Sequence, residues 1–362
     1  MTIRAHIFTN ISEILFLKHI PDFSKTLNDV EFSFGLDIPD NIDVLILYTR
    51  ASYSIPTRLP KNRTAFYAGE PDVIHPYSTR FLNQFGIVLT TSPKDLDTIK
   101  LHETVSAMSF VGIDFTKKDE PLNITYFEDM ECPKKDNKIS IVTSNKAHTK
   151  FHQDRLRFID IIKEKIPEHI ELYGHGFKPI NDKKDALLKH KYHIALENGG
   201  GPYAWTEKLS DPLMCWAFPF YHGCTNVEND IPAAAFNYID IDNPDQVVNQ
   251  IITAVKDDLW ENRKTDISTA RDILFSEFNI MKKFAQIAHQ LVALDTKTPQ
   301  GPKRLIRSER SLWPEKKCRG SIPETFIRSS LLYLYPNIEL KAAKFLKKRK
   351  DKRAESRSQK KA

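Results

Sequence analysis

Residues 196–212, LENGGGPYAWTEKLSDP, bring two glutamates, an asparagine, three glycines and a lysine into one short segment. An apolar run ends just before it, and Thr206 is a suitable N-cap for a helix that starts at Glu207. The N-terminus of a helix offers unpaired N–H groups and a positive dipole end, which together suit a phosphate group. Lys208 can neutralise a diphosphate, and the Glu207 carboxylate can accept hydrogen bonds from both ribose hydroxyls. An ordinary glycine loop with a charged first helical turn fits the same residues, so spacing alone leaves both interpretations open.

The elements that must position this segment follow from alternating apolar runs and helix-like stretches. Expected strands cover residues 5–9, 44–48, 64–68, 87–90, 138–143, 170–173, 192–196, 218–221 and 236–241. Expected helices cover residues 152–165, 206–215 and 244–255, and helical character returns from 267 to 294. Apolar strands separated by helices are typical of parallel sheets covered on both faces. We therefore expect an α/β protein with two Rossmann-like domains, at residues 1–134 and 135–296, linked near residues 131–138.

The composition is that of an ordinary globular protein, with 41% hydrophobic and 28% charged residues. Its four cysteines lack CxxC spacing and are expected to be free thiols of a cytosolic protein. No segment approaches the roughly 18 apolar residues that cross a bilayer, and the first residues do not read as a signal peptide.

Residues 191–241 resemble the donor-binding signature of the α1,3-fucosyltransferase family. That signature runs as FENS, a short loop, YVTEK, an apolar helix, VPIYWG and an IP-x-x-x-F segment. The matching residues here are Glu197-Asn198, Thr206-Glu207-Lys208, PFYHG at 219–223, and Ile231-Pro232 with Phe236.

Two upstream stretches resemble the same family. In KISIVTSNKAHTKFHQDRLRFIDII, the arginine that holds the donor pyrophosphate in the family corresponds to Arg155, with Arg157 as the second choice. In RTAFYAGEPDV, the family's "FYTGE" strand end places Glu70 as the general base in the acceptor cleft.

The resemblance implies a GT-B fold, with two Rossmann-like domains facing each other across a cleft. It also implies an inverting transfer of fucose from GDP-fucose to a surface glycan such as lipopolysaccharide, with an α1,3 linkage. The expected catalytic base is Glu70, and the expected donor-binding residues are Arg155, Glu197, Asn198, Tyr203, Glu207 and Lys208. No metal or other cofactor is expected, because fixed cations and helix N–H groups can stabilise a departing diphosphate. The DxD sequence at Asp240 and Asp242 is accordingly not assigned to a metal.

The sequence also departs from the family pattern around the donor. Ala204 and Trp205 precede TEK, Tyr203 lies one place earlier than usual, and His222 stands where an aromatic residue is commoner. Two alternatives stay open on this basis. One is a glycosyltransferase of the same fold that uses another nucleotide sugar, and the other is an inactive nucleotide-binding or basic-tailed interaction protein.

The C-terminal segment, residues 297–362, is expected to hold one amphipathic helix and a basic tail. Residues 341–362 contain 11 Lys/Arg and 2 Asp/Glu, a net charge of +9 that leaves −3 for the rest of the chain. The tail is expected to be disordered or ordered only on a surface. Residues 326, 327, 330, 331, 334 and 335 can share one apolar helical face, which predicts binding to the inner face of an anionic membrane. A solubilising end is the alternative, and nothing in the sequence indicates a nucleic-acid-binding fold.

Overall fold

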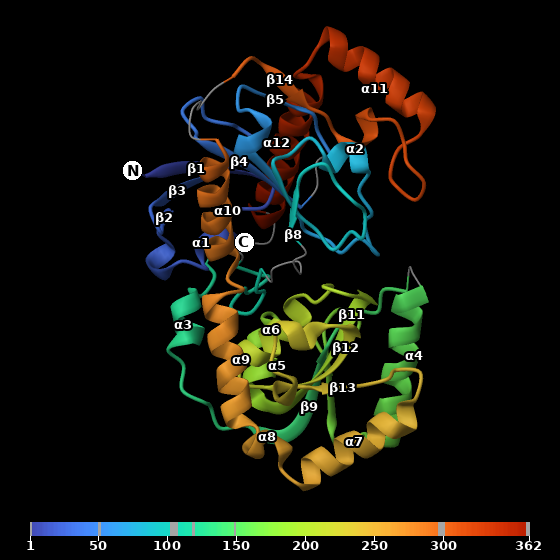
Figure 1. Ribbon diagram of the computed structural model, residues 1–362. Coiled ribbons are helices and arrows are strands. Elements are labelled where there is room, and N and C mark those ends of the chain that lie inside the picture. The colour runs from blue at the N-terminus through green and yellow to red at the C-terminus, as the bar shows by residue number, and fades with distance from the viewer. Residues whose placement is uncertain are drawn as a thin grey trace. The chain divides into compact units, whose positions relative to one another are not determined.

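The computed structural model describes residues 2–49, 52–101, 108–117, 120–147, 150–295 and 301–359, with side chains described as far as Arg349. The chain forms two compact units, each built around its own parallel sheet (Figure 1). The first unit comprises residues 1–13, 25–103 and 284–362, and the second comprises residues 14–24 and 104–283.

The first unit contains a seven-stranded sheet in the order β2-β3-β1-β4-β6-β7-β8. Every neighbouring pair in this sheet is parallel except β2 with β3. The strands are β1 (Ile3–Phe8), β2 (Thr26–Leu27), β3 (Val30–Gly35), β4 (Val44–Thr49), β6 (Thr64–Ala68), β7 (Ile87–Leu89) and β8 (Ile99–Leu101). The central strands β4 and β6 are apolar and buried along nearly their whole length, as strands covered on both faces must be. A separate antiparallel pair joins β5 (Ile55–Thr57) to β14 (Arg304–Ile306).

The second unit contains a five-stranded, all-parallel sheet in the order β10-β9-β11-β12-β13. Its strands are β9 (Asp136–Val142), β10 (Ile170–Tyr173), β11 (His190–Gly201), β12 (Phe218–Cys224) and β13 (Asn237–Tyr238). Its main helices are α4 (Lys150–Lys165), α5 (Lys183–Lys189), α6 (Glu207–Met214), α7 (Pro244–Lys256) and α9 (Lys264–Ser276). Helix α4 packs beside α7, and α6 packs beside α5 and α9. This is the α/β arrangement of parallel sheets that the sequence predicts.

Short elements complete both units. The first unit also has α2 (Thr79–Leu82), and the second has α1 (Ile14–Leu17), α3 (Ile124–Glu128) and α8 (Leu259–Asn262). The single helical stretch expected at 267–294 is two helices, because α9 ends at Ser276 and α10 (Ile280–Leu294) begins four residues later. The side-chain amide oxygen of Asn279 accepts from the backbone N–H of Met281 at 2.9 Å, which caps the new helix.

The compact units divide the chain differently from the expected ranges. Residues 104–134 belong to the second unit, and residues 284–362 belong to the first. The expected linker at 131–138 lies inside the second unit, where β9 begins at Asp136. The ammonium group of Lys135 is buried there and donates to the carbonyl of Leu188 at 3.2 Å. Burial lowers the pKa of Lys135 to about 8, and this stretch belongs to the second unit.

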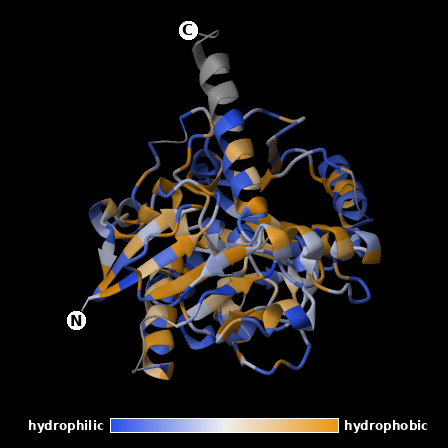
Figure 2. Cartoon of the chain, turned by 90° about the horizontal axis from the view of Figure 1, so that it is seen from above, coloured by the Kyte–Doolittle hydropathy of each residue, from blue (hydrophilic) through white to orange (hydrophobic). Residues whose placement is uncertain are grey.

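The C-terminal segment is helical, with α11 (Ile322–Leu334) followed by α12 (Ile338–Gln359). The expectation of a tail ordered at most on a surface is wrong for the beginning of α12. The Glu339 carboxylate accepts hydrogen bonds from the Ser54 N–H and hydroxyl, both at 2.7 Å, and Ala343 belongs to the core of the first unit. Figure 2 shows apolar and polar residues alternating along this helix. Among the described helices, none combines the length and the apolar composition needed to span a bilayer.

Candidate functional site

A pocket of about 470 Å³ opens in the second unit where β9 and β11 end and where α4, α5 and α6 begin. This edge of a parallel sheet is where α/β proteins place their ligands. Four of the residues expected to bind the donor line it: Arg155, Asn198, Glu207 and Lys208. The other lining residues are Ile141, Val142, Thr143, Ser144, Lys146, His152, Ile159, Lys183, His193, Ile194, Ala195 and Leu196.

Arg155 is fixed by its neighbours before any ligand is considered. It projects from α4, is only 6% exposed, and donates from Nη1 to the Asn198 side-chain oxygen at 2.8 Å. A second bond runs from Nη2 to the Ser144 carbonyl at 3.3 Å. Burial lowers its pKa, but a guanidinium keeps its charge in proteins. Its Nε has no hydrogen-bond partner among the described residues, so a preorganised cation retains an unused N–H group.

Glu207 and Lys208 occupy the first turn of α6. Thr206 caps this helix, and its hydroxyl oxygen accepts from the Lys208 N–H at 3.4 Å. The Lys208 ammonium lies 3.0 Å from Glu207 Oε1. Burial acts to raise the pKa of Glu207, but Lys208 and then Lys183 outweigh it and lower that pKa to about 2. Glu207 is therefore a carboxylate at neutral pH, as a group that accepts hydroxyl protons in hydrogen bonds must be.

Glu197 serves the start of α6 and does not line the pocket. Its carboxylate accepts from the Thr206 N–H at 2.8 Å and from the Thr206 hydroxyl at 2.7 Å. Burial raises its pKa. Gly223 on β12 makes room for this side chain, because a Cβ at that position would lie 2.4 Å from Glu197 Cγ. Glu197 thus affects the 470 Å³ pocket through the position of α6.

Tyr203 also lies outside the pocket lining. It has a positive φ of 61°, and its N–H donates to the Asn226 side-chain oxygen at 2.7 Å. The three glycines that precede it do not line the pocket either. They extend β11 beyond its expected end, so that Gly201 pairs with Cys224 of β12. The expected glycine loop is therefore an extension of β11.

Lys183 and His193 line the pocket, although the sequence did not single them out as ligand-binding residues. Lys183 donates to the fully buried Asp211 carboxylate at 2.8 Å. His193 Nδ1 lies 2.8 Å from the Ser140 hydroxyl, and burial, followed by Lys183, lowers the pKa of His193 to about 3. His193 is thus neutral at physiological pH, whereas Lys183 adds its charge to those of Lys146, Arg155 and Lys208. Asp182 is the N-cap of α5, so a local sequence pattern places Lys183 at the start of a helix. The partner of Lys183, Asp211, is distant in sequence and is not indicated by that pattern.

Glu70 lies in the first unit, directly after β6, where the sequence analysis expected the end of a strand. It lines a pocket of about 310 Å³ with residues that follow β1 and β4, among them Thr9, Thr49 and Tyr53. The close approach of Gly69 to the backbone of Thr49, where a Cβ would lie 2.8 Å from the Thr49 Cα, fixes how the chain leaves β6. The Glu70 carboxylate is therefore placed at the carboxyl edge of its own parallel sheet.

The DxD residues follow β13 and lie outside the lining of the 470 Å³ pocket. The Asp240 carboxylate accepts from the Asp242 N–H at 3.0 Å, an ordinary turn interaction. Across the described residues, no three His, Cys, Asp or Glu side chains are grouped so that they could hold a metal ion.

No known family model matches the sequence. Solved structures do resemble this chain. A crystal structure of α1,3-fucosyltransferase with GDP has a TM-score of 0.50 at 15% identity, over 83% of this chain and 92% of that one. The structure of α1,3-fucosyltransferase with GDP-fucose has a TM-score of 0.47 at 15% identity and the same coverage. A structure described as trehalose-6-phosphate from E. coli bound with UDP-2-fluoro glucose has a TM-score of 0.44 at 8% identity, over 83% and 100% of the two chains.

The likeness to the α1,3-fucosyltransferase structure with GDP concerns the fold. The chain has an α/β fold of the GT-B type, with two Rossmann-like units. The comparison agrees with the fold class that the sequence predicts.

Proposed function

We propose that this protein is an inverting glycosyltransferase that transfers fucose from GDP-fucose to a hydroxyl of a surface glycan such as lipopolysaccharide, with an α1,3 linkage. The observation that carries the proposal is the grouping of Arg155, Asn198, Glu207 and Lys208 on one pocket. These residues are separated in sequence, and the family resemblance assigned each of them to the donor: Asn198, Glu207 and Lys208 through the signature, and Arg155 through the stretch upstream of it. The GT-B fold supports the broader statement that the substrate is a nucleotide sugar.

Each donor group has a suitable partner in the pocket. Arg155 and Lys208 bind the diphosphate, and the N–H groups at the start of α6 add the positive end of its dipole. Lys183 contributes a further positive charge on the same wall. The ionised Glu207 accepts hydrogen bonds from the ribose hydroxyls, and Asn198 positions the donor while it holds Arg155.

The reaction follows from these roles. The acceptor hydroxyl attacks the anomeric carbon of fucose from the side opposite the diphosphate, so the configuration at that carbon inverts. As the new C–O bond forms, Glu70 takes the hydroxyl proton and the bond to the diphosphate breaks. The departing negative charge is stabilised by Arg155, Lys208 and the helix N–H groups. We propose that this stabilisation needs no metal ion and that Asp240 and Asp242 take no part.

A transferase of the same fold with a different donor is the second candidate. Tyr203 lies outside the pocket lining, and His222 Nδ1 is 3.1 Å from the Ile239 carbonyl and also outside it. The residues that depart from the family signature are thus not the ones that would hold the diphosphate. The nucleotide should be tested first, by thermal shift with GDP, UDP, ADP and CMP at equal concentration. Stabilisation by GDP above the others supports the proposal, a preference for UDP, ADP or CMP favours the second candidate, and no response to any nucleotide refutes both.

We also propose that the enzyme binds the inner surface of the membrane through its C-terminal helices. Helix α11 and the residue after it expose seven large hydrophobic side chains, among them Phe326, Ile327, Leu331, Leu334 and Tyr335. The basic helix α12 follows, and each Lys or Arg near an anionic bilayer contributes about 1 kcal/mol to binding. A peripheral location would bring the enzyme to a lipid-linked saccharide.

A further inference from the structure

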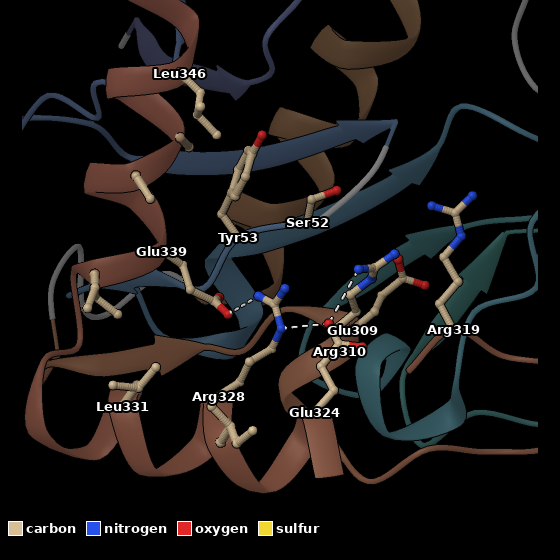
Figure 3. Close-up of a pocket in the computed structure, with 14 residues that line it drawn as sticks. Ser52, Tyr53, Glu309, Arg310, Arg319, Glu324, Arg328, Leu331, Glu339 and Leu346 are labelled. Carbon is tan, nitrogen blue, oxygen red and sulfur yellow. Dashed lines mark hydrogen bonds and ion pairs between the residues drawn. The ribbon is translucent and has the colours of Figure 1, made fainter. Parts of the chain in front are cut away.

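A second and larger pocket, of about 850 Å³, lies in the first unit (Figure 3). Its apolar wall comes from α11 and α12 and consists of Ile327, Leu331, Ile338, Ala342, Ala343 and Leu346. Its volume falls within the roughly 300–1,000 Å³ range of small-molecule sites. A concave apolar wall of this size suits an aliphatic group better than it suits a sugar.

Charged side chains form the remainder of the wall, and nearly all of them are paired. Arg328 donates to Glu324 at 2.9 Å and to Glu339 at 2.6 Å, and these pairs are drawn in Figure 3. Glu309 lies 3.0 Å from the buried ring of His75. Arg319 is exposed and has no hydrogen bond or ion pair to any described residue.

The apolar and the charged groups lie at different sides of the pocket. Figure 3 places Leu331 and Leu346 at one side of the pocket and Arg319 at the other. The uncompensated cation is therefore separated from the apolar wall. A ligand with an aliphatic part and an anionic group at one end matches both features.

The large pocket also adjoins the pocket that holds Glu70. Ser52 and Tyr53 line both of them, so the two share a wall within the same unit. A molecule seated against α11 and α12 can continue past Tyr53 toward Glu70. The proposed function requires an acceptor hydroxyl at Glu70.

We infer that the 850 Å³ pocket binds the apolar part of the acceptor, and that the acceptor is an anionic glycolipid whose charged group pairs with Arg319. The inference rests on the proposed function for its use of Glu70, but the binding that it predicts can be measured without turnover. The aliphatic chain packs against Leu331, Ala342 and Leu346, and the sugar extends toward the base. The enzyme thereby selects a lipid-linked acceptor over a free saccharide.

The test uses octyl phosphate and methyl phosphate as probes on the full chain, titrated by ligand-observed NMR below the concentration at which octyl phosphate forms micelles. Octyl phosphate should bind at least about tenfold more tightly than methyl phosphate, since each buried methylene can add up to roughly fourfold. Ala342→Trp fills the pocket from an exposed position of α12. It should remove at least about nine-tenths of the preference for octyl phosphate over methyl phosphate. Phe345→Trp changes a side chain of the same helix that is 61% exposed and outside the lining, and should leave the preference intact.

A second pair of measurements tests the charged end. Arg319→Gln should weaken octyl phosphate by roughly tenfold and leave the uncharged probe octyl glucoside unchanged. Leu331→Asp makes the apolar wall polar without adding bulk, and should weaken both octyl probes. It serves in place of Ala342→Trp if that variant does not fold.

The outcomes separate this inference from the proposed function. Equal octyl phosphate binding by wild type, Ala342→Trp and Leu331→Asp would overturn the inference, whatever the result with GDP. Equal losses in Phe345→Trp and Ala342→Trp would overturn it too, since they would indicate adsorption to the exposed helix surface. Failure of the wild type to bind GDP would refute the proposed function and leave the amphiphile result standing.

Discussion

Replacing Lys208 with alanine should weaken GDP binding strongly, because it removes the cation that offsets the negative charges of Glu207 and Glu197. Lys208 Nζ lies 3.0 Å from Glu207 Oε1 and 3.6 Å from Glu197 Oε2. In the variant, the Glu207 carboxylate faces the position proposed for the diphosphate without its nearest positive charge. The change thus removes the attraction between the Lys208 ammonium and the diphosphate, and it leaves the repulsion between the Glu207 carboxylate and the diphosphate.

The magnitude follows from these two effects. Loss of a hydrogen bond to a charged group costs about 1.5–3 kcal/mol, which is roughly a tenfold to hundredfold loss of affinity. Repulsion by Glu207 places the expected loss toward the upper end. Lys208 also lowers the pKa of Glu207, so that pKa rises in the variant. As the pH falls, Glu207 becomes protonated in the variant at a higher pH than in the wild type. Protonation removes its repulsion of GDP, so the difference in GDP affinity between variant and wild type should become smaller.

Calorimetric titration with GDP at pH 7.5 and at pH 5.5 measures both quantities. Lys189→Ala is the matched control, because Lys189 is an exposed lysine at the end of α5 and does not line the pocket. Equal GDP affinity for wild type and Lys208→Ala would refute the assignment. A loss of the same size in Lys189→Ala would show that net charge, and not the position of Lys208, governs binding.

Four further outcomes are expected. Glu70→Gln should abolish transfer and leave GDP affinity in calorimetry within about twofold, and a matching loss of both would contradict its role as the base. Activity should persist in EDTA, whereas complete loss restored by Mn²⁺ would contradict the metal-free proposal. Lys183→Met should lower the free energy of unfolding by about 2–4 kcal/mol in urea, because Asp211 stays buried without its cation. Burial already raises the pKa of Asp211, so this deficit should grow as the pH rises above about 4, and a pH-independent deficit would refute the explanation. Truncation after Arg349 should reduce sedimentation with anionic vesicles at low salt but leave the fold intact, and unchanged sedimentation would refute the membrane proposal.

The truncation is placed after Arg349 because the beginning of α12 is packed into the first unit. Ala343, which such a truncation retains, is buried in the core of the first unit. A deletion from Lys341 onward would therefore disturb folding as well as charge. Charge counting alone predicted a separable tail, because a few buried residues at the start of a basic helix leave no visible signal in its composition.

The strands and helices that surround the 470 Å³ pocket could be predicted, because the periodicity of their apolar residues is a local property of the sequence. The runs ISIV, IELY and FPFY are strands, and Thr206 caps α6 as its residue type suggests. The glycines at 199–201 were misread because both a loop and an extended strand tolerate glycine. Only the pairing of Gly201 with Cys224 distinguishes the two.

Roles that depend on partners distant in the chain could not be predicted in the same way. Glu197 looks like a ligand-binding residue in the motif, yet its carboxylate is occupied by Thr206. Its position also depends on the missing side chain of Gly223. Lys183 becomes a cation of the pocket through its pairing with Asp211, which lies 28 residues away. Such assignments need the fold, because no local pattern records which side chains the fold brings together.

The antiparallel pairing of β14 with β5 has a consequence for how the protein is made. Residues 304–306 must pair with residues 55–57, so the first unit contains segments from both ends of the chain. A ribosome has synthesised all of residues 14–283 before the strand that completes that pair emerges. The second unit can therefore fold during synthesis, whereas the first unit has to wait with part of its apolar sheet uncovered. Within the cell, the unit whose synthesis begins first is thus the unit that is completed last.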